Sequence, residues 1–172
     1  MSSIQVVKSN IAELHVDFVV NAANEGLRAG SGVCGAIFDA AGSAQLQAAC
    51  DKLGGCAVGD VVVTPGFALP AKYIIHAVGP RWNGGRSGEE KQLRSCYRKS
   101  LEIVREYGGH SIAFPVISSG IFGYPKEEAW KAAISTVRDD LARNCDYDIA
   151  VTFAVNGRSS LELGNRILAE ER

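Results

Sequence analysis

The feature that most constrains the fold of this chain is a regular alternation of short β-rich apolar runs with longer segments of helical spacing. Six runs predict strands, at residues 4–7, 17–20, 60–64, 72–78, 111–117 and 148–155. Helices are expected over 32–41, 43–53 and 89–107, from Pro125 onward, and near the C-terminus, with Ser159 or Ser160 as the cap. This alternation predicts an α/β fold in which helical layers cover a mixed, mostly parallel sheet. Ligands of such sheets bind beyond the carboxyl ends of the strands.

Apolar residues at helical spacing define the faces that the helices should bury. In the helix over 89–107 they are Leu93, Cys96, Tyr97, Leu101 and Val104, and after Pro125 they are Ala129, Ala133, Ile134, Val137 and Leu141. In the helix over 32–41 the expected buried face contains Val33, Ile37, Ala40 and Ala41.

Length and organisation predict one domain that spans residues 1–172. A chain of this size can bury about 70% of its unfolded surface, so its core needs neither disulfides nor metals. The sequence contains no internal repeat and no linker, and residues 83–90 (NGGRSGEE) are expected to form a mobile surface loop.

Charge and cysteine usage exclude several classes of function. The net charge of −1 lacks the basic excess that binding to duplex nucleic acid requires. Five cysteines without a CxxC pair argue against a disulfide framework and a zinc site, and we expect neither a metal nor a cofactor. No apolar run approaches the ~20 residues that cross a bilayer, and the N-terminus does not resemble a signal peptide. We therefore expect a cytoplasmic protein with reduced thiols and no membrane partner.

The segment from Gly30 to Gly35 (GSGVCG) satisfies the dinucleotide pattern GxGxxG and opens a helix. It does not fit a Rossmann unit, because residues 21–29 separate it from the strand and no acidic residue ends the next strand. A glycine loop at a helix start can approach phosphate or ribose closely. It can equally be a tight turn that requires positive φ angles, and both interpretations remain open.

The segment from Ser118 to Gly123 (SSGIFG) is a stronger candidate. It lies between a buried strand and a helix start, where free N–H groups and the helix dipole favour an anion. Its small residues allow backbone amides to converge into a phosphate-binding nest. An ordinary βα turn is the alternative, but such a turn needs neither two serines nor two glycines, so anion binding is favoured.

Polar residues next to the strands have simpler explanations. Asn21 and Asn24 end a buried run, where asparagines commonly satisfy loop backbone, although such a pair could also orient a sugar hydroxyl. His76 stands among apolar neighbours and is expected to be a hydrogen-bonded core residue. His15 and His110 are expected on surface loops.

Taken together, these segments resemble the macro domain family of ADP-ribose-binding proteins and hydrolases. The likeness covers nearly the whole chain and rests on four blocks in order, at 16–24 (VDFVVNAAN), 30–42 (GSGVCGAIFDAAG), 69–80 (LPAKYIIHAVGP) and 111–129 (SIAFPVISSGIFGYPKEEA). It implies a three-layer α/β/α fold with a mixed, mostly parallel central sheet. It also implies partners, namely ADP-ribose with ADP-ribosylated proteins or O-acetyl-ADP-ribose.

The resemblance assigns roles to residues. Asn24 matches the asparagine that binds the distal ribose, and Gly32 and Val33 match the loop over that ribose and the phosphates. The diphosphate loop corresponds to Ser118, Ser119, Gly120, Ile121, Phe122 and Gly123, with Phe122 near the distal ribose. At the adenine end stand Asn10, Ile11, Val155 and Asn156. Asn10 replaces the usual aspartate and can accept only as an uncharged carbonyl, and Val155 supplies an aliphatic wall where many members place an aromatic ring.

Cys34 is the main departure from the family pattern. Hydrolases that resemble this chain usually have an aspartate there, followed by a histidine, whereas this chain has SGVCGAIF at 31–38. The GVC sequence is similar to some viral macro domains that are hydrolytic without that acid. Cys34 could be a nucleophile, since a helix N-terminus lowers thiol pKa, but no histidine or lysine adjoins it in sequence. A small residue that shapes the pocket is the favoured interpretation.

Three functions follow in order of preference. The first is hydrolysis of ADP-ribosyl esters, with Asn24 and, at the usual aspartate position, Cys34 as the candidate catalytic residues. The second is a module that binds ADP-ribose and catalyses little, because Cys34 replaces the acid. The third, far below, is a nicotinamide-dependent oxidoreductase.

Overall fold

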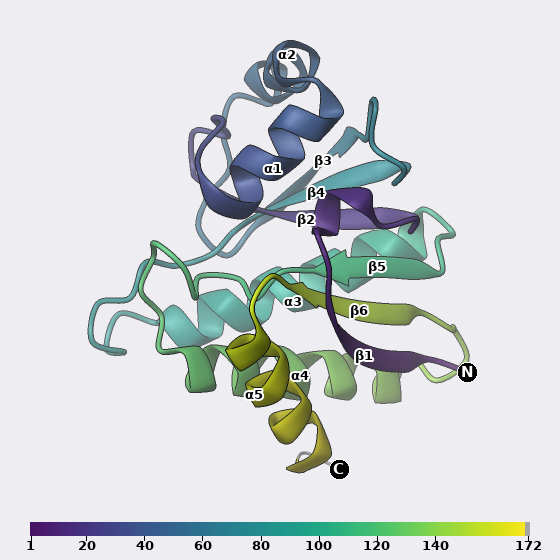
Figure 1. Ribbon diagram of the computed structural model, residues 1–172, viewed down its shortest axis with the longest axis vertical. Coiled ribbons are helices and arrows are strands. Elements are labelled where there is room, and N and C mark those ends of the chain that lie inside the picture. Colours follow the sequence, from purple (N-terminus) through teal and green to yellow (C-terminus); the bar gives the residue numbers. More distant parts are fainter. Residues whose placement is uncertain (171–172) are drawn as a thin grey trace.

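The computed structural model of the protein describes residues 1–170 and contains one six-stranded sheet (Figure 1). The strands are β1 (Ser3–Lys8), β2 (Phe18–Ala23), β3 (Val61–Pro65), β4 (Tyr73–Val78), β5 (Ser111–Phe114) and β6 (Ala150–Val155). Their order is β1-β6-β5-β2-β4-β3, and every neighbouring pair is parallel except β3 with β4. The mixed, mostly parallel sheet predicted from the sequence is therefore confirmed.

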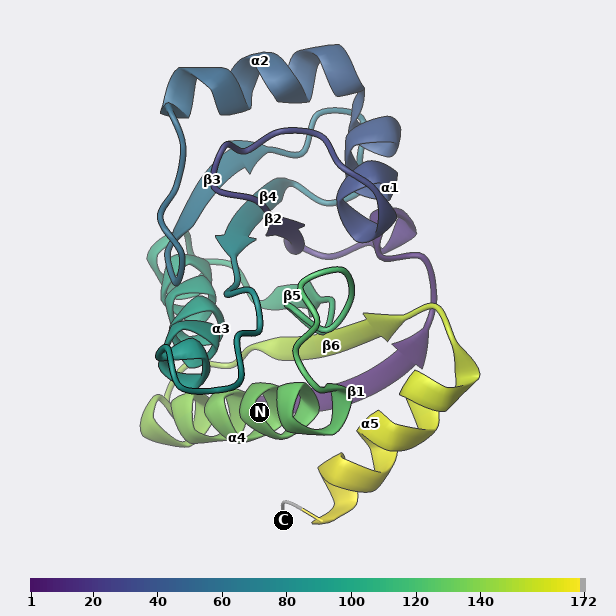
Figure 2. The same cartoon turned by 90° about the vertical axis from the view of Figure 1, so that its left-hand side faces the viewer.

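Helices cover both faces of this sheet (Figures 1 and 2). They are α1 (Gly32–Ala41), α2 (Ser43–Leu53), α3 (Glu89–Glu106), α4 (Lys126–Arg143) and α5 (Arg158–Glu170), with a short 3₁₀ helix, η1 (Ile11–Glu13). One apolar cluster joins η1, α1 and α2 to the sheet, and a second joins α3, α4 and α5 to its other face. The fold is thus a three-layer α/β/α sandwich.

Strand β2 illustrates why the central strands are almost entirely apolar. Phe18 and Val20 pack in the cluster with α3 and α4, whereas Val19 and Ala23 pack in the cluster with α1 and α2. Alternate side chains of a strand point to opposite faces of the sheet, and here both faces are covered by helices.

Helix α1 buries a different face from the predicted one. Ile37 and Ala41 are buried as expected, but Ala40 is exposed and Val33 is only partly buried. Cys34 and Phe38 take their place. The reason is burial of apolar area, since the large ring of Phe38 gains far more by leaving water than the single methyl of Ala40.

Several predicted boundaries were wrong by a few residues. The fifth strand ends at Phe114, before Pro115, which has no N–H to donate to a neighbouring strand. Pro125 precedes the first residue of α4 and is its N-cap. Helix α5 begins at Arg158, so Ser159 and Ser160 lie in its first turn and do not cap it. Strand β2 continues to Ala23, three residues beyond the predicted run 17–20, and so includes Asn21.

Candidate functional site

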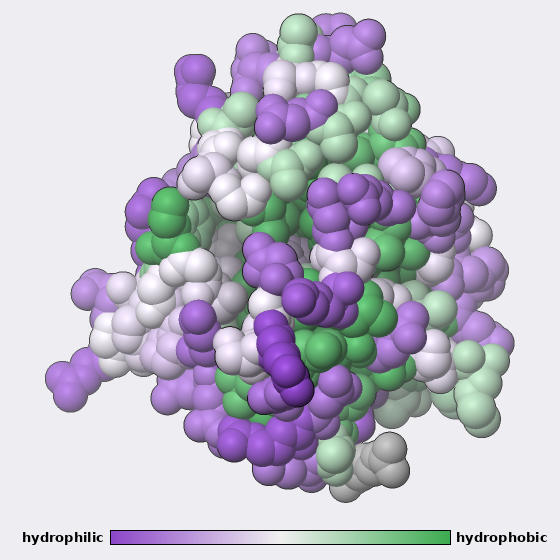
Figure 3. Space-filling model, viewed as in Figure 1, coloured by the Kyte–Doolittle hydropathy of each residue, from purple (hydrophilic) through white to green (hydrophobic). Residues whose placement is uncertain are grey.

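The parallel strands bring several loops to one edge of the sheet. The loops after β2, β4, β5 and β6 all leave from carboxyl strand ends, and β1 ends at the same edge. Figure 3 shows that this face of the molecule is hollowed between the start of α1 and the loop that joins β5 to α4. Both glycine-rich segments of the sequence therefore border one depression.

The first glycine-rich loop, residues 30–35, leads directly into α1. Ser31 is the N-cap, but its side chain makes no capping hydrogen bond. Within residues 1–170, no group accepts from the N–H groups of Gly32, Val33 and Cys34, whereas the N–H of Gly35 donates to the Ser31 carbonyl at 3.3 Å. Three free amides at the positive end of a helix favour an anion.

Internal packing explains part of this loop. Gly32 has a φ angle of +60°, and a Cβ at Gly35 would lie only 2.6 Å from the Gly30 carbonyl oxygen. Gly32 supports the tight-turn interpretation. Gly35 is required because the loop packs directly against the helix backbone.

The second glycine-rich loop, residues 118–123, is folded by a few internal hydrogen bonds. The N–H of Gly123 donates to the Gly120 carbonyl at 3.0 Å, and the N–H of Tyr124 donates to the Ser118 carbonyl at 2.9 Å. Across the described part of the chain, no acceptor faces the N–H groups of Gly120, Ile121 and Phe122. Successive free amides of this kind form an anion-binding nest.

Ser118 and Ser119 have structural roles in this loop. The Ser119 hydroxyl donates to the Val116 carbonyl at 2.7 Å. Ser118 has a φ angle of +67° and is 6% exposed, and its hydroxyl has no partner within residues 1–170. A Cβ at Gly79 would clash with that hydroxyl oxygen, so Ser118 packs against the first residue after β4.

Asn24 holds the loop that follows β2. Its Oδ1 accepts from the N–H of Arg28 and its Nδ2 donates to the carbonyl of Arg28, both at 2.9 Å. Satisfying loop backbone is therefore one role of this side chain. A carboxamide has two donors and two lone pairs, so one N–H and one lone pair remain for a ligand.

Cys34 is enclosed at the start of α1. It is 6% exposed, and its thiol lies 3.6 Å from the Arg28 carbonyl. Burial raises the pKa of the Cys34 thiol and outweighs the opposing hydrogen bonds from Asn21 and Gly30. The thiol therefore stays protonated at neutral pH, which argues against a nucleophile and favours a residue that shapes the pocket.

A buried polar cluster lies beneath Cys34. Asn21 Nδ2 donates to His76 Nδ1 at 3.1 Å, and His76 Nε2 lies 2.9 Å from the Thr64 hydroxyl. Burial lowers the pKa of His76 to about 4, so the ring is neutral at pH 7. The prediction that His76 is a hydrogen-bonded core residue is confirmed, and His15 and His110 are exposed, as expected.

The residues expected at the adenine end lie where β1 and β6 end side by side. The N–H of Ser9 donates to the Val155 carbonyl at 2.9 Å, which holds the two strand ends together. Asn10 is exposed and its Oδ1 accepts from the N–H of Ala12 at 3.0 Å, so the carbonyl expected to contact adenine already caps η1. Val155 is buried and Asn156 is exposed.

Sequence reasoning missed the contribution of the β4–α3 segment, residues 79–88. The N–H of Trp82 donates to the Phe122 carbonyl at 2.8 Å, and the Arg81 guanidinium lies 4.5 Å from the centre of the Phe122 ring. The loop expected over 83–90 ends at Gly88, because Glu89 and Glu90 belong to α3. The Glu89 carboxylate accepts hydrogen bonds from three backbone N–H groups of this loop. A glutamate that follows a glycine-rich stretch at a helix start was the available signal.

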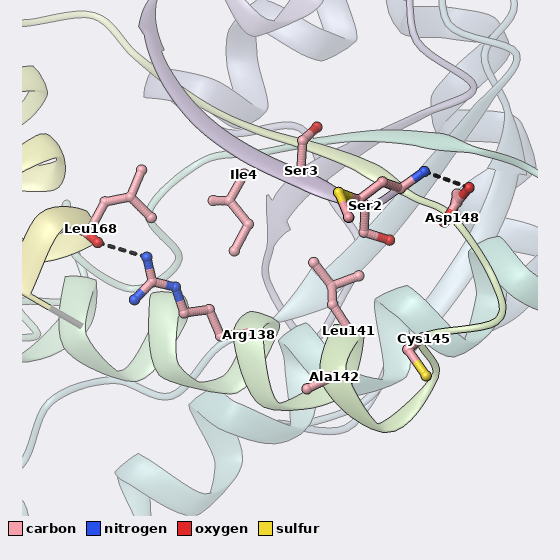
Figure 4. A pocket seen from close by; sticks show the side chains of 10 residues that line it. Ser2, Ser3, Ile4, Arg138, Leu141, Ala142, Cys145, Asp148 and Leu168 are labelled. Carbon is pink, nitrogen blue, oxygen red and sulfur yellow. Dashed lines mark hydrogen bonds and ion pairs between the residues drawn. The ribbon is translucent and has the colours of Figure 1, made fainter. Parts of the chain in front are cut away.

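Two other cavities lie away from these loops. One, of about 450 Å³, is bordered by β1, α4 and α5 (Figure 4), and Arg138 in its wall donates to the Leu168 carbonyl at 2.6 Å. The other, of about 530 Å³, lies over α3 and α4 beside the ion pair of Arg105 with Asp140. Neither includes a residue predicted from the sequence to bind the ligand.

Two features are absent from residues 1–170, a metal-binding cluster and a membrane-spanning helix. No group of three or more His, Cys, Asp or Glu side chains is placed to hold a metal. None of the helices there is long and apolar enough to cross a membrane.

Comparison with known proteins identifies the family. Residues 20–133 match the family model described as Macro domain. The chain belongs to the macro domain family. A macro domain-containing protein of Methanosarcina mazei is 50% identical over 141 residues, which cover 82% of this macro domain chain and 75% of the relative.

Two further proteins similar to this chain have names that mention ADP or ADP-ribose. The ADP-ribose glycohydrolase MACROD2 of Xenopus laevis is 47% identical over 149 residues, which cover 86% of this chain and 35% of the relative. A solved structure of the Oceanobacillus iheyensis macrodomain with ADP matches with a TM-score of 0.94 at 34% identity, covering 99% of this chain and 92% of that chain.

Proposed function

We propose that this macro domain binds ADP-ribose in the depression between its two glycine-rich loops. The observation that carries the proposal is two sets of free backbone N–H groups that border the depression on its two sides. One set belongs to Gly32 to Cys34 and the other to Gly120 to Phe122. Each set can donate to diphosphate oxygens without a cationic side chain, which suits a protein with a net charge of −1. The solved macrodomain with ADP and the Xenopus relative named for ADP-ribose support this ligand.

We infer further that the domain hydrolyses ADP-ribosyl esters, either mono-ADP-ribose on acidic side chains or O-acetyl-ADP-ribose. The remaining N–H and lone pair of Asn24 would orient the distal ribose. A ligand phosphate oxygen would orient a water molecule toward the ester or toward C1″. At C1″ of a protein-linked ester, the water oxygen bonds to C1″, the side-chain carboxylate leaves with the electron pair of the C1″–O bond, and a water proton passes to solvent. At the acetyl ester, the water oxygen bonds to the carbonyl carbon, the ribose oxygen leaves with the electron pair of the broken bond and takes up one water proton, and acetate and the other proton are released. The enzyme name of the Xenopus relative supports this reaction class.

Cys34 favours a second candidate, a module that binds ADP-ribose with little turnover. The buried, protonated thiol stands where related hydrolases have an aspartate, so it supplies no general base. Orientation of the ligand and water would then be the whole of the catalysis.

Incubation with a protein that carries ADP-ribose on glutamate separates the two candidates. Release of ADP-ribose above background at enzyme excess is expected for the hydrolase, and we expect Asn24→Ala to lower kcat more than affinity. No release, together with a calorimetric affinity for ADP-ribose, would leave the binding module. Absence of that affinity would contradict both candidates. Cys34→Asp restores an acid at this position, and a rise in turnover would show that the absence of the acid limits the rate.

A further inference from the structure

The β4–α3 segment, residues 79–88, presents an arginine at the lip of the depression where ADP-ribose is proposed to bind. We propose that Arg81 is a specificity-determining residue that makes this domain prefer ADP-ribose attached within acidic stretches of polypeptide. The inference rests on the proposed function, since it names the substrate class of the same site.

The segment is fixed in place by one buried carboxylate. Glu89 is 2% exposed and accepts from the N–H groups of Asn83 and Gly85 at 2.9 Å and of Ser87 at 2.6 Å. Burial alone would raise the pKa of Glu89, but these hydrogen bonds outweigh it and lower the pKa, so the carboxylate stays charged. A charged acceptor of three amides holds the segment in one conformation.

Trp82 joins the segment to the diphosphate loop. Its ring packs on Tyr124, with centroids 4.7 Å apart, and a Cβ at Gly85 would lie 2.8 Å from the ring. The N–H of Trp82 donates to the Phe122 carbonyl at 2.8 Å. Arg81, the preceding residue, is therefore held beside Phe122 by backbone as well as by its own side chain.

Arg81 has a charge with no internal partner. Its guanidinium stacks on the Phe122 ring at 4.5 Å, yet the residue is exposed. It takes part in none of the ion pairs found within residues 1–170, and residues 79–88 contain a second arginine, Arg86, but no acid. Stacking on an aromatic ring orients a guanidinium and leaves its N–H edge available to a carboxylate.

The position of Phe122 decides which part of a substrate this charge can reach. The proposed site gives the diphosphate to the free amides of Gly120 to Phe122, and the proposed function gives the distal ribose to Asn24, which follows β2. The β4–α3 segment leaves from β4, the neighbour of β2 in the sheet, so Arg81 lies toward the end of the site that holds the distal ribose. The attached polypeptide leaves from the distal ribose. Arg81 therefore faces the polypeptide and not the nucleotide, and Ile121, which is 80% exposed on the same lip, offers an apolar contact beside it.

The experiment compares binding of two ADP-ribosyl peptides with a non-hydrolysable linkage, one with acidic and one with neutral flanking residues. We expect the unaltered protein to prefer the acidic peptide by about fivefold, the upper range for one exposed ion pair, and to lose this preference in salt of about 0.5 M. Arg81→Ala should abolish the preference, Arg81→Lys should keep most of it, and the matched control Arg86→Ala should leave it unchanged. Affinity for free ADP-ribose should change less than twofold in all three variants.

Three results would overturn the inference. They are equal affinity of the unaltered protein for the two peptides, an equal loss for both peptides in Arg81→Ala, or the same loss of preference in Arg86→Ala. An equal loss that extends to free ADP-ribose would show that Arg81 acts only through Phe122. These results would leave the proposed function intact, because only a failure of the unaltered protein to bind free ADP-ribose contradicts that function.

Discussion

The two glycine-rich loops look alike in sequence, but the structure explains the glycines of the first loop and Gly120 of the second in different ways. In the first loop, Gly35 allows the backbone of Gly30 to pack on α1, and Gly32 adopts a positive φ angle. In the second loop, a Cβ at Gly120 would meet nothing within 4 Å, and no positive φ angle requires the glycine. The packing and backbone conformation of the protein require glycine at Gly32 and Gly35 but not at Gly120. Under the proposed function, the open space at Gly120 is where the ligand approaches the loop.

Gly120→Val gives the largest expected effect on this comparison. The added side chain projects into the open space that the proposed diphosphate occupies, and contact with two or more amides is lost. Hydrogen bonds to charged groups contribute about 1.5–3 kcal/mol each, so ADP-ribose affinity should fall on the order of 100-fold or more. Calorimetric titration measures this loss, and an unchanged melting temperature serves as the control for folding. Unchanged affinity would show that the second loop does not hold the phosphates.

Acid should destabilise the buried polar cluster that lies beneath the first loop. No such titrating cluster lies beneath the second loop in the described chain. The first loop stands above Asn21 and His76, and the pKa of His76 is lowered to about 4 from an ordinary value of 6.5. The unfolded chain therefore binds the proton first as the pH falls. Stabilisation is complete above about pH 6.5 and is lost by about pH 4, and this difference corresponds to about 3 kcal/mol of unfolding free energy.

Urea denaturation between these two pH values measures the effect. His76→Gln removes the titrating ring and should flatten the dependence of unfolding free energy on pH. The same slope in His76→Gln and the unaltered protein would assign the acid sensitivity to other groups.

Gly35→Ala and Gly120→Ala apply the same substitution to both loops. At Gly35 the new methyl group would lie 2.6 Å from a carbonyl oxygen, so the backbone must shift. We expect Gly35→Ala to cost about 1–2 kcal/mol of unfolding free energy after the better helix propensity of alanine is included. Gly120→Ala should change stability by less than about 0.5 kcal/mol, the usual range for exposed positions. Equal costs in the two variants would remove the distinction between the loops.

The parts of this fold that the sequence predicts are those that depend on local periodicity. Leu93, Cys96, Tyr97, Leu101 and Val104 are all buried on α3 as expected, because helical spacing alone determines which side chains share a face. The predicted buried face of α1 was wrong at Ala40, because tertiary packing buries Phe38 in its place.

The sequence predicts which loops form the candidate site but not the hydrogen bonds and contacts within them. Its two loops border one depression, as parallel strands require, yet the bond of Asn24 to Arg28 and the carboxylate of Glu89 over residues 83–87 depend on where loop amides point. Loop amides have no periodicity, so no pattern in the sequence fixes their direction. Arg81 was missed for the same reason, since its contact with Phe122 joins segments about 40 residues apart in the chain.

Ser118→Ala gives the smallest expected effect and tests whether the second loop recognises its ligand through backbone alone. The Ser118 hydroxyl is buried, has no partner in the described chain and lies against Gly79. Its removal eliminates an unsatisfied polar group, so stability should be unchanged or rise by up to about 1 kcal/mol. ADP-ribose affinity should stay within about twofold, because the proposed contacts are the N–H groups of Gly120 to Phe122. A loss of about tenfold, equal to roughly 1.4 kcal/mol, would instead place this hydroxyl on the ligand and make the loop a mixed site of side chain and backbone.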